Sequence, residues 1–355
     1  MSAANLLAYC RAGFEKECAQ EMMALAGDAG VEGFVKARPD SAHAIFNPHD
    51  EAAGVSFASR IDPADLVFAR QVVRASPLLS GLPVGDRATP IVAAARELGS
   101  VYRELFLETP DTNDGKSLAS LIRPLEPHLE RALAGAGVAI DAPAALDRLH
   151  VFFVGGTACH VGVTRIAASS PWSMGIPRIR MPGGAPSRST LKLAEALAVF
   201  VGGDDSATRL GPGMTAVDLG ASPGGWTWQL VRRGLLVTAV DNGPMDAALL
   251  DTGQVRHRRE DGFRFRPPEP VDWLVCDMVE SPSRVCALVA RWVAEGWCRE
   301  AIFNLKLPMK KRREEVLRAR HIVAETLAGV PHRLKVKQLY HDREEVTAWL
   351  APGRR

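Results

Sequence analysis

A glycine-dense segment in the second half of the chain has the residue types and spacing of a cofactor-binding loop. It occupies residues 218–227, between the apolar stretch 215–217 and the expected helix 228–233. An acid that ends a strand, a glycine-rich turn and a helix start together form a nucleotide-type cofactor site in a doubly wound sheet. Small residues allow the backbone to approach a ligand, and the helix start offers unpaired N–H groups to an anion. Taken alone, such a loop can also be a tight structural turn.

Two acidic residues further along the chain fit the same cofactor. Asp241 ends the buried-strand run 235–240, where a carboxylate can accept hydrogen bonds from a ribose diol. Asp261 lies in the polar turn 259–262, where it could meet an adenine amine. The order and spacing of these acids favour a cofactor site over a structural turn. The loop residues that we expect to touch the cofactor are Gly220, Ser222, Pro223, Gly224 and Gly225.

Two lysines and two acids could carry out a proton transfer beside that loop. Asp277 and Lys306 end neighbouring apolar strands, whose tips lie on the carboxyl edge where ligands bind. Glu345 begins an antiparallel last strand on the same edge, and Lys192 belongs to a helix that precedes the sheet. Because lysine is a general base only when its pKa falls, we expect Lys192 to depress the pKa of Lys306. The two acids would orient the amines. Singly, each lysine could be an ordinary solvated charge.

The elements that must position these residues alternate between strand and helix from about residue 188 onward. This alternation predicts an α/β domain with a mostly parallel, doubly wound sheet and helices on both faces. A short polar turn joins the last two strands, so the final strand should run antiparallel. The expected strands are 216–219, 236–240, 273–276, 301–305, 334–340 and 346–350.

The sequence pattern of the front half predicts α+β structure, and a linker follows it. Residues 169–189 are rich in proline, glycine and serine, and we place the main domain boundary there. A long amphipathic helix is expected at 117–134 and a hairpin at 150–165. The expected domains are 1–75, 76–170 and 188–355, with 171–187 as the linker.

Composition excludes several classes of protein. With 47% hydrophobic and 24% charged residues, the 355-residue chain is an ordinary globular protein. Its net charge of +2 requires any nucleic-acid affinity to come from local patches, such as the basic run 310–313. That run either starts a solvated helix or contacts phosphate. The six cysteines lack metal-ligand spacing, so no metal site is expected. No signal peptide or membrane segment is visible, and we expect a cytoplasmic monomer without membrane contact.

The four ordered charged residues resemble the Lys-Asp-Lys-Glu tetrad of the FtsJ-like RNA ribose 2′-O-methyltransferases. The matching motifs are Ser-Arg-x-x-x-Lys-Leu at Lys192, Cys-Asp-Met-Val-Glu at Asp277, Asn-Leu-Lys-Leu-Pro at Lys306 and Arg-Glu-Glu-Val at Glu345. The glycine-rich loop is similar to motif I of Rossmann-fold methyltransferases, with Ser222 where cysteine is expected. The resemblance implies a Rossmann-fold domain, S-adenosylmethionine as cofactor and catalytic roles for the four residues, with Lys306 as general base. It also implies that Ser189 and Asp277 help to hold the cofactor.

A closer resemblance is to the subfamily of these enzymes that modifies one cytidine of 23S rRNA. Segments 10–18, 186–193, 240–244, 276–280, 303–312 and 339–346 carry it, so it covers nearly the whole chain. It implies a ferredoxin-like domain and a THUMP RNA-binding domain in the front half, and 23S rRNA, free or in a large-subunit precursor, as the partner. Two alternatives stay open. The chain could modify another RNA such as tRNA, or it could be an RNA-binding assembly factor with an inactive transferase fold.

Overall fold

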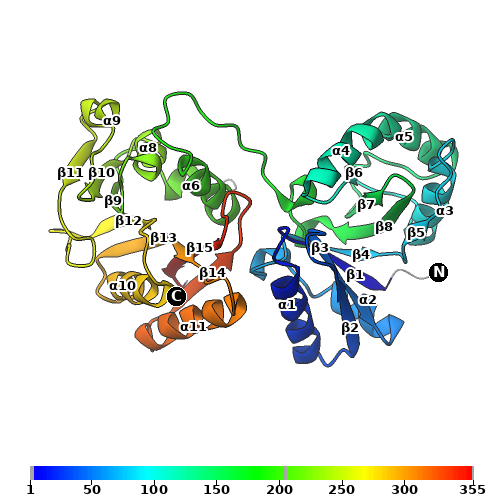
Figure 1. Cartoon of the computed structure of the whole chain (residues 1–355), viewed down its shortest axis with the longest axis horizontal. Helices are drawn as coiled ribbons and strands as arrows, with labels where there is room; N and C mark the ends of the chain where they lie inside the picture. Colours follow the sequence, from blue (N-terminus) through cyan, green and yellow to red (C-terminus); the bar gives the residue numbers. More distant parts are fainter. Residues whose placement is uncertain (1–3, 203–205, 354–355) are drawn as a thin grey trace. The chain divides into compact units, whose positions relative to one another are not determined.

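The chain folds into two compact units, each built on one β-sheet (Figure 1). The computed structural model describes residues 4–202 and 206–353. The units are Met1–Ile176 and Pro177–Arg355, so the division falls inside the span rich in proline, glycine and serine. Among the described residues, no helix combines the length and the apolar character that crossing a membrane requires.

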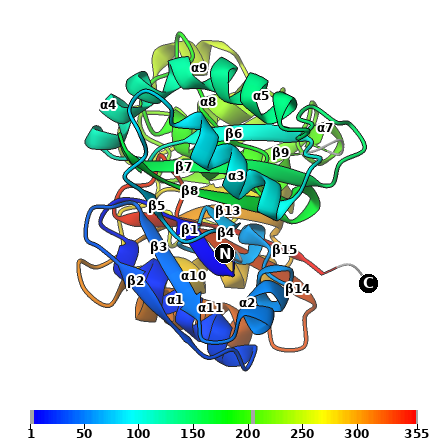
Figure 2. The same cartoon turned by 90° about the vertical axis from the view of Figure 1, so that its right-hand side faces the viewer.

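The front unit has an eight-stranded sheet in the order β2-β3-β1-β4-β8-β7-β6, with β5 paired to β8. Figure 2 shows α1 and α2 beside the β1–β4 half of this sheet, and α3, α4 and α5 beside the other half. The strands are β1 (Asn5–Tyr9), β2 (Gly33–Ala37), β3 (His43–Pro48), β4 (Gln71–Ala75), β5 (Leu79–Ser80), β6 (Glu104–Glu108), β7 (Asp147–Gly155) and β8 (Ala158–Arg165). The α-helices are α1 (Glu15–Asp28), α2 (Glu51–Ala58), α3 (Ala88–Leu98), α4 (Asn113–Ile122) and α5 (Glu126–Gly135), and the 3-10 turns are η1 (Pro63–Asp65), η2 (Arg123–Leu125), η3 (Ile166–Ala168) and η4 (Ser173–Gly175).

The single helix expected at 117–134 is wrong, because the segment is broken into α4 and α5 by the 3-10 turn η2. Pro124 lies in that turn and Pro127 in the first turn of α5. Proline lacks the N–H that a helix interior needs and clashes with the preceding turn, so it is tolerated only near a helix start.

The expected boundary at 75/76 falls inside the front sheet. Strand β4 ends at Ala75 and pairs with β1 on one side and β8 on the other. The backbone hydrogen bonds therefore run without a break from the first 75 residues into the next segment. The separation of the front half into two domains stays a prediction.

The back unit has a seven-stranded sheet in the order β11-β10-β9-β12-β13-β15-β14. Its strands run parallel except β15, which is antiparallel to both neighbours. The expected mostly parallel sheet with an antiparallel last strand is therefore confirmed. The strands are β9 (Thr215–Leu219), β10 (Leu236–Val240), β11 (Val255–Arg258), β12 (Val271–Cys276), β13 (Cys298–Lys306), β14 (His332–Lys337) and β15 (Glu345–Pro352). Sequence analysis missed β11 because Val-Arg-His-Arg offers no apolar run.

Helices cover both faces of the back sheet (Figure 1). Helices α6 and α8 lie on one face with α9, and α10 packs against β13 and α11 on the other. The bounds are α6 (Thr190–Ala196), which continues into the π-helical turn η5 (Leu197–Val201), α7 (Ser206–Arg209), α8 (Gly225–Val231), α9 (Ala247–Asp251), α10 (Pro282–Ala294) and α11 (Arg312–Thr326).

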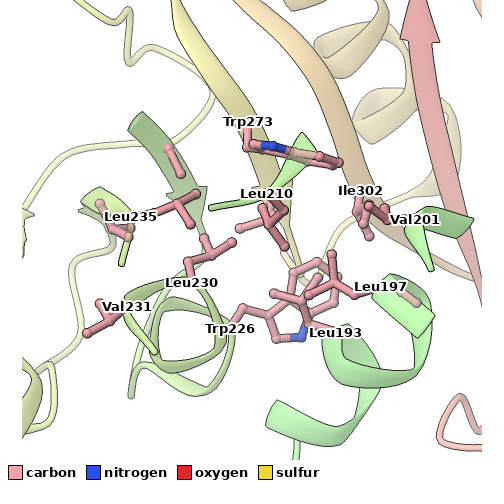
Figure 3. Close-up of a cluster of buried hydrophobic side chains, with 14 of the residues drawn as sticks. Leu193, Leu197, Val201, Leu210, Trp226, Leu230, Val231, Leu235, Trp273 and Ile302 are labelled. Atoms are coloured by element: carbon pink, nitrogen blue, oxygen red, sulfur yellow. The ribbon is translucent and has the colours of Figure 1, made fainter. Parts of the chain in front are cut away.

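A core cluster of buried apolar side chains fixes α6 and α8 on the sheet (Figure 3). Leu193 and Leu197, four residues apart and hence on one helical face, join Trp226 of α8 and Ile302 of β13 in this cluster. Burying a side chain of this size is worth about 1.5–3 kcal/mol. Lys192, which immediately precedes Leu193 in α6, is thereby held at a fixed place near the carboxyl ends of the strands.

Candidate active site at the carboxyl edge of the back sheet

The four charged residues singled out in the sequence meet at one place. Lys306 Nζ lies 2.8 Å from Asp277 Oδ1 and 2.9 Å from Glu345 Oε2. Lys192 Nζ lies 2.7 Å from Glu345 Oε2 and 3.5 Å from Asp277 Oδ2. Each amine therefore contacts both carboxylates. We call Lys192, Asp277, Lys306 and Glu345 the charged quartet.

Strand pairing explains why residues so far apart in sequence converge. Lys306 and Glu345 are direct partners in the antiparallel pairing of β13 with β15. Asp277 follows β12, which runs parallel to β13 and ends beside it. Helix α6 carries Lys192, and the hydroxyl of Thr190 ties that helix to α8 by donating to the Gly225 carbonyl at 2.9 Å.

Sequence analysis missed one member of this cluster, Asn304. Its Nδ2 donates to Asp277 Oδ1 at 3.1 Å and to Glu345 Oε2 at 2.8 Å, and its Oδ1 accepts from the Thr347 hydroxyl at 2.6 Å. The side chain is fully buried. A signal existed, because residues two apart on a strand share a face, and Asn304 is a polar residue two before Lys306. The amide holds the two carboxylates of the quartet in fixed positions.

The expected depression of the pKa of Lys306 is wrong. Burial is the largest single influence and lowers this pKa, but charge attraction and hydrogen bonds from Asp277 and Glu345 together raise it above the ordinary value of 10.5. Two carboxylates within hydrogen-bonding distance stabilise the ammonium form, and the amine of Lys192 does not reverse the sign. The ammonium form of Lys306 is therefore favoured at neutral pH.

A pocket of about 380 Å³ adjoins the quartet through Asp277. It lies at the carboxyl ends of β9, β10 and β12, where ligands bind in doubly wound sheets. Of the expected cofactor residues, the pocket is lined by Gly220, Ser222, Asp241, Asp261 and Asp277. Pro223, Gly224, Gly225 and Ser189 do not line it; the first three shape the loop, and Ser189 lies against Gly225. Further lining residues are Val240, Asn242, Glu260, Gly262, Phe263, Met278, Val279 and Glu280.

Two glycines of the loop hold positions that other residues could not. Gly220 has a φ of +79° and Gly224 a φ of +121°, in the region that L-residues rarely adopt. A Cβ on Gly220 would lie 2.8 Å from Met278 Cγ, and a Cβ on Gly224 would lie 2.3 Å from Leu249 Cδ1. The loop thus depends on glycine for its shape at both ends.

Asp241 closes the loop from the neighbouring strand. Its Oδ2 accepts from the Ser222 N–H at 3.1 Å, and its Oδ1 accepts from the Gly243 N–H at 2.7 Å. Asp261 is half exposed and accepts from the Phe263 N–H at 2.9 Å. Asp261 also pairs with Arg264 at 3.7 Å. Each carboxylate can accept about four hydrogen bonds, so the bonds named here do not use the full capacity of either acid.

Asp218, the next-to-last residue of β9, is buried with one oxygen unsatisfied. Asp218 Oδ2 accepts from the Thr227 hydroxyl at 2.7 Å, whereas Oδ1 has no hydrogen-bond partner within residues 4–202 and 206–353. Burial raises the pKa of Asp218 from 3.8 to about 7, and the nearby carboxylates of Asp277 and Asp241 add to the rise. An orphaned buried oxygen requires an explanation, and a cationic or N–H donor of a bound ligand would supply one.

We expect Asp218→Asn to change the pH dependence of stability. A folded-state pKa above the unfolded value makes the folded form bind its proton more tightly, so wild-type stability falls as pH rises from about 4 to about 7. Asparagine does not titrate but can still accept from Thr227. The thermal midpoint of the variant minus that of wild type should therefore be larger at pH 8 than at pH 5. Each kcal/mol of difference in unfolding free energy shifts the midpoint by about 2–4 °C. Scanning calorimetry of both proteins at both pH values tests this. The same difference in thermal midpoint at pH 5 and at pH 8 would contradict it.

The basic run 310–313 follows β13, whose last residue, Lys306, belongs to the quartet. Lys310 and Lys311 are exposed, and Arg312 pairs with Glu344, the residue before Glu345. Lys311 has a φ of 60°, unusual for a non-glycine residue.

Among the described residues no group of His, Cys, Asp and Glu could hold a metal ion.

The fold and the loop together define a class. A doubly wound, mostly parallel sheet with an antiparallel last strand and a glycine-rich loop at its carboxyl edge is the architecture of a Rossmann-fold methyltransferase. Consistently, a family model described as FtsJ-like methyltransferase matches residues 185–309. A model described as RlmM ferredoxin-like domain matches residues 3–73, and one described as ribosomal RNA large subunit methyltransferase M, N-terminal, matches residues 86–165.

Curated relatives match over the full length. The chain is 54% identical to the ribosomal RNA large subunit methyltransferase M of Methylococcus capsulatus, over 98% of this chain and 98% of the relative. It is 48% identical to the protein of that name from Thauera aminoaromatica, over 99% and 96%. It is also 48% identical to the one from Shewanella sp. (strain ANA-3), over 98% of each chain. The chain belongs to the ribosomal RNA large subunit methyltransferase M family, which confirms the resemblance seen in the sequence.

Proposed function

We propose that this protein transfers a methyl group from S-adenosylmethionine to the ribose 2′-hydroxyl of a cytidine in 23S rRNA. The observation that carries the proposal is that Asp277 belongs both to the charged quartet and to the pocket beside the glycine-rich loop. Because Asp277 belongs to both, a hydroxyl held at the quartet and a cofactor held in the pocket would lie next to each other. Proximity of this kind accounts for a large part of enzymatic rate enhancement.

The pocket residues fit S-adenosylmethionine. Asp241 at the tip of β10 lines the pocket and suits the ribose diol. Asp218, whose unpaired Oδ1 would suit a cationic amine, is buried beneath the loop and is not part of the pocket lining. The absence of a Cβ at Gly220 lets Met278, another lining residue, pack against the loop at the pocket. When bound, S-adenosylmethionine supplies an activated methyl group and a positive charge.

Within the quartet, we assign Lys306 as the general base that accepts the 2′-hydroxyl proton. A ribose hydroxyl is a weak nucleophile until its proton leaves, so the acceptor must be held at the attacking oxygen. Asp277 and Glu345 hold Nζ of Lys306 from two sides. Lys192 contacts the same two carboxylates, so the two amines interact with the same negative charges. Because the pKa of Lys306 is raised, the neutral amine is a minor form at neutral pH, and its population should limit the rate.

The alternatives differ in substrate and in activity. Methylation of another RNA such as tRNA would use the same quartet, whereas a purely RNA-binding assembly factor would need none of the four residues. Labelled methyl transfer to unmodified 23S rRNA and to tRNA, followed by nucleotide-resolution mapping of 2′-O-methyl groups, separates these outcomes. Transfer to tRNA alone, or methylation of a base in place of a ribose, would reject the proposal.

We assign the basic run at 310–313 to phosphate contact. The double variant Lys310→Glu/Lys311→Glu should weaken RNA binding by about tenfold or more at moderate salt, and reduce the salt dependence of binding by about one unit per lost contact. Affinity for S-adenosylhomocysteine should stay unchanged. The matched control is Arg291→Glu/Arg299→Glu, which makes the same charge change on exposed residues near the amino end of β13. Equal RNA affinities for the two double variants would exclude a specific contact.

A further inference from the structure

The two most exposed large apolar side chains among the described residues lie beside the charged quartet. Val279 is 90% exposed and Met309 is 88% exposed, and the next, Val84 in the front unit, is 71% exposed. Val279 comes two residues after Asp277, and Met309 three residues after Lys306. Strands β12 and β13 are parallel neighbours, so the loops that carry these side chains leave the sheet side by side. Their exposure therefore coincides with the site and is not scattered over the surface.

The loop that carries Met309 is held so that this side chain stays in solvent. At its start, the Leu307 N–H donates to the Glu344 carbonyl at 2.8 Å and the Leu307 side chain is buried. At its end, Arg312 pairs with the Glu344 side chain. Between these anchors Lys311 adopts a φ of 60°, a costly conformation that the surrounding structure must impose. Met309 has no neighbour to cover it in this arrangement.

The loop that carries Val279 is held in a similar way. Met278 packs inward, since a Cβ on Gly220 would lie 2.8 Å from its Cγ and a Cβ on Gly262 would lie 3.0 Å from its Sδ. Met278 is half-buried, whereas Val279, at the bend that follows, is left in solvent. Val279 also lines the pocket, and so does Asp277 of the quartet.

The quartet itself is recessed. Side-chain exposure is 24% for Lys306, 16% for Lys192, and 15% for Asp277 and Glu345. A ribose hydroxyl reaches Lys306 Nζ only if its nucleotide leaves the stacked RNA strand. The base is attached to C1′, the carbon next to the one that bears the hydroxyl, so it must then lie at the rim of the site. An unstacked base exposes an apolar face and needs a new surface to cover it.

We propose that Val279 and Met309 form a binding surface for the unstacked base of the nucleotide that is methylated. This inference rests on the proposed ribose 2′-O-methylation. The two side chains cover the base from adjacent loops while the quartet holds the ribose. An apolar surface of this kind accepts an unpaired base and gives no equivalent contact to a base still stacked in a helix.

The test compares Val279→Ser/Met309→Ser with wild type in the full-length protein. The probes are unmodified 23S rRNA and the same RNA with an abasic ribose at the mapped methylation position. On intact RNA, kcat/KM for methyl transfer should fall about tenfold, the size expected for losing partly buried apolar contact. On abasic RNA, wild type should already show this loss, and the double variant should add none. Met309→Leu should lose less activity than Met309→Ser because apolar surface is retained outside the pocket lining.

Controls separate this inference from the function on which it rests. Leu236→Ser removes a 51% exposed apolar side chain at the start of β10, on the opposite edge of the sheet, and should leave methyl transfer unchanged. Met309→Ser alone, which lies outside the pocket lining, should not alter affinity for S-adenosylhomocysteine. If wild type forms 2′-O-methyl groups but the serine variants match it, or lose activity equally on abasic RNA, the base-binding surface is overturned. If wild type forms no 2′-O-methyl group, the proposed function fails and the inference falls with it.

Discussion

Lys306→Ala should reduce methyl transfer by about 10²–10⁴-fold, the usual contribution of a positioned general base. The substitution removes the amine that lies 2.8 Å from Asp277 and 2.9 Å from Glu345, whereas the glycine-rich loop, Asp241 and the basic run keep their places. Single-turnover rates with 23S rRNA measure the chemical step. Affinities for RNA and for S-adenosylhomocysteine should stay close to those of wild type.

Two controls make this result specific. Lys306→Met keeps most of the side-chain length without the amine, and it should be as inactive as the alanine variant. Arg318→Ala removes a 66% exposed cation from α11 and should leave the rate unchanged. A Lys306→Ala protein that binds both ligands and methylates at the native rate would eliminate Lys306 as the base.

The rate of methyl transfer should rise about tenfold per pH unit from pH 7 to pH 9, or about 100-fold in all. The sign follows from the raised pKa of Lys306: below its pKa the amine is mostly protonated, and the neutral fraction grows tenfold with each pH unit. Single-turnover rates with both substrates saturating measure this profile, because binding steps then do not contribute.

Two variants identify the titrating group. Lys306→Ala should show a flat profile at its low residual rate. Asp277→Asn removes one of the two carboxylates that raise the pKa of Lys306, so any plateau should move to lower pH. A wild-type profile that levels off at or below pH 8 would show that a group other than Lys306 limits the rate.

Local sequence patterns were sufficient for every strand of the back sheet except β11, and for the position of the glycine-rich loop. Apolar runs marked β9, β10, β12 and β13, and the short polar turn after β14 indicated the antiparallel β15. The same method failed where the local signal was weak or contradicted. Strand β11 has one apolar residue followed by three polar ones, and the prolines at 124 and 127 contradict the helical periodicity of 117–134.

The sequence by itself singled out the four charged residues that meet in the structure. Lys192, Asp277, Lys306 and Glu345 each stand in a local motif at the end or start of an element, and topology brings such ends to one edge of a parallel sheet. Tertiary structure alone decided the direction in which the pKa of Lys306 shifts. The pKa of a lysine depends on burial and on every charge within a few ångströms, and these come from segments remote in sequence. For the same reason, the bridging amide of Asn304 and the exposure of Val279 and Met309 emerged only from the packed structure.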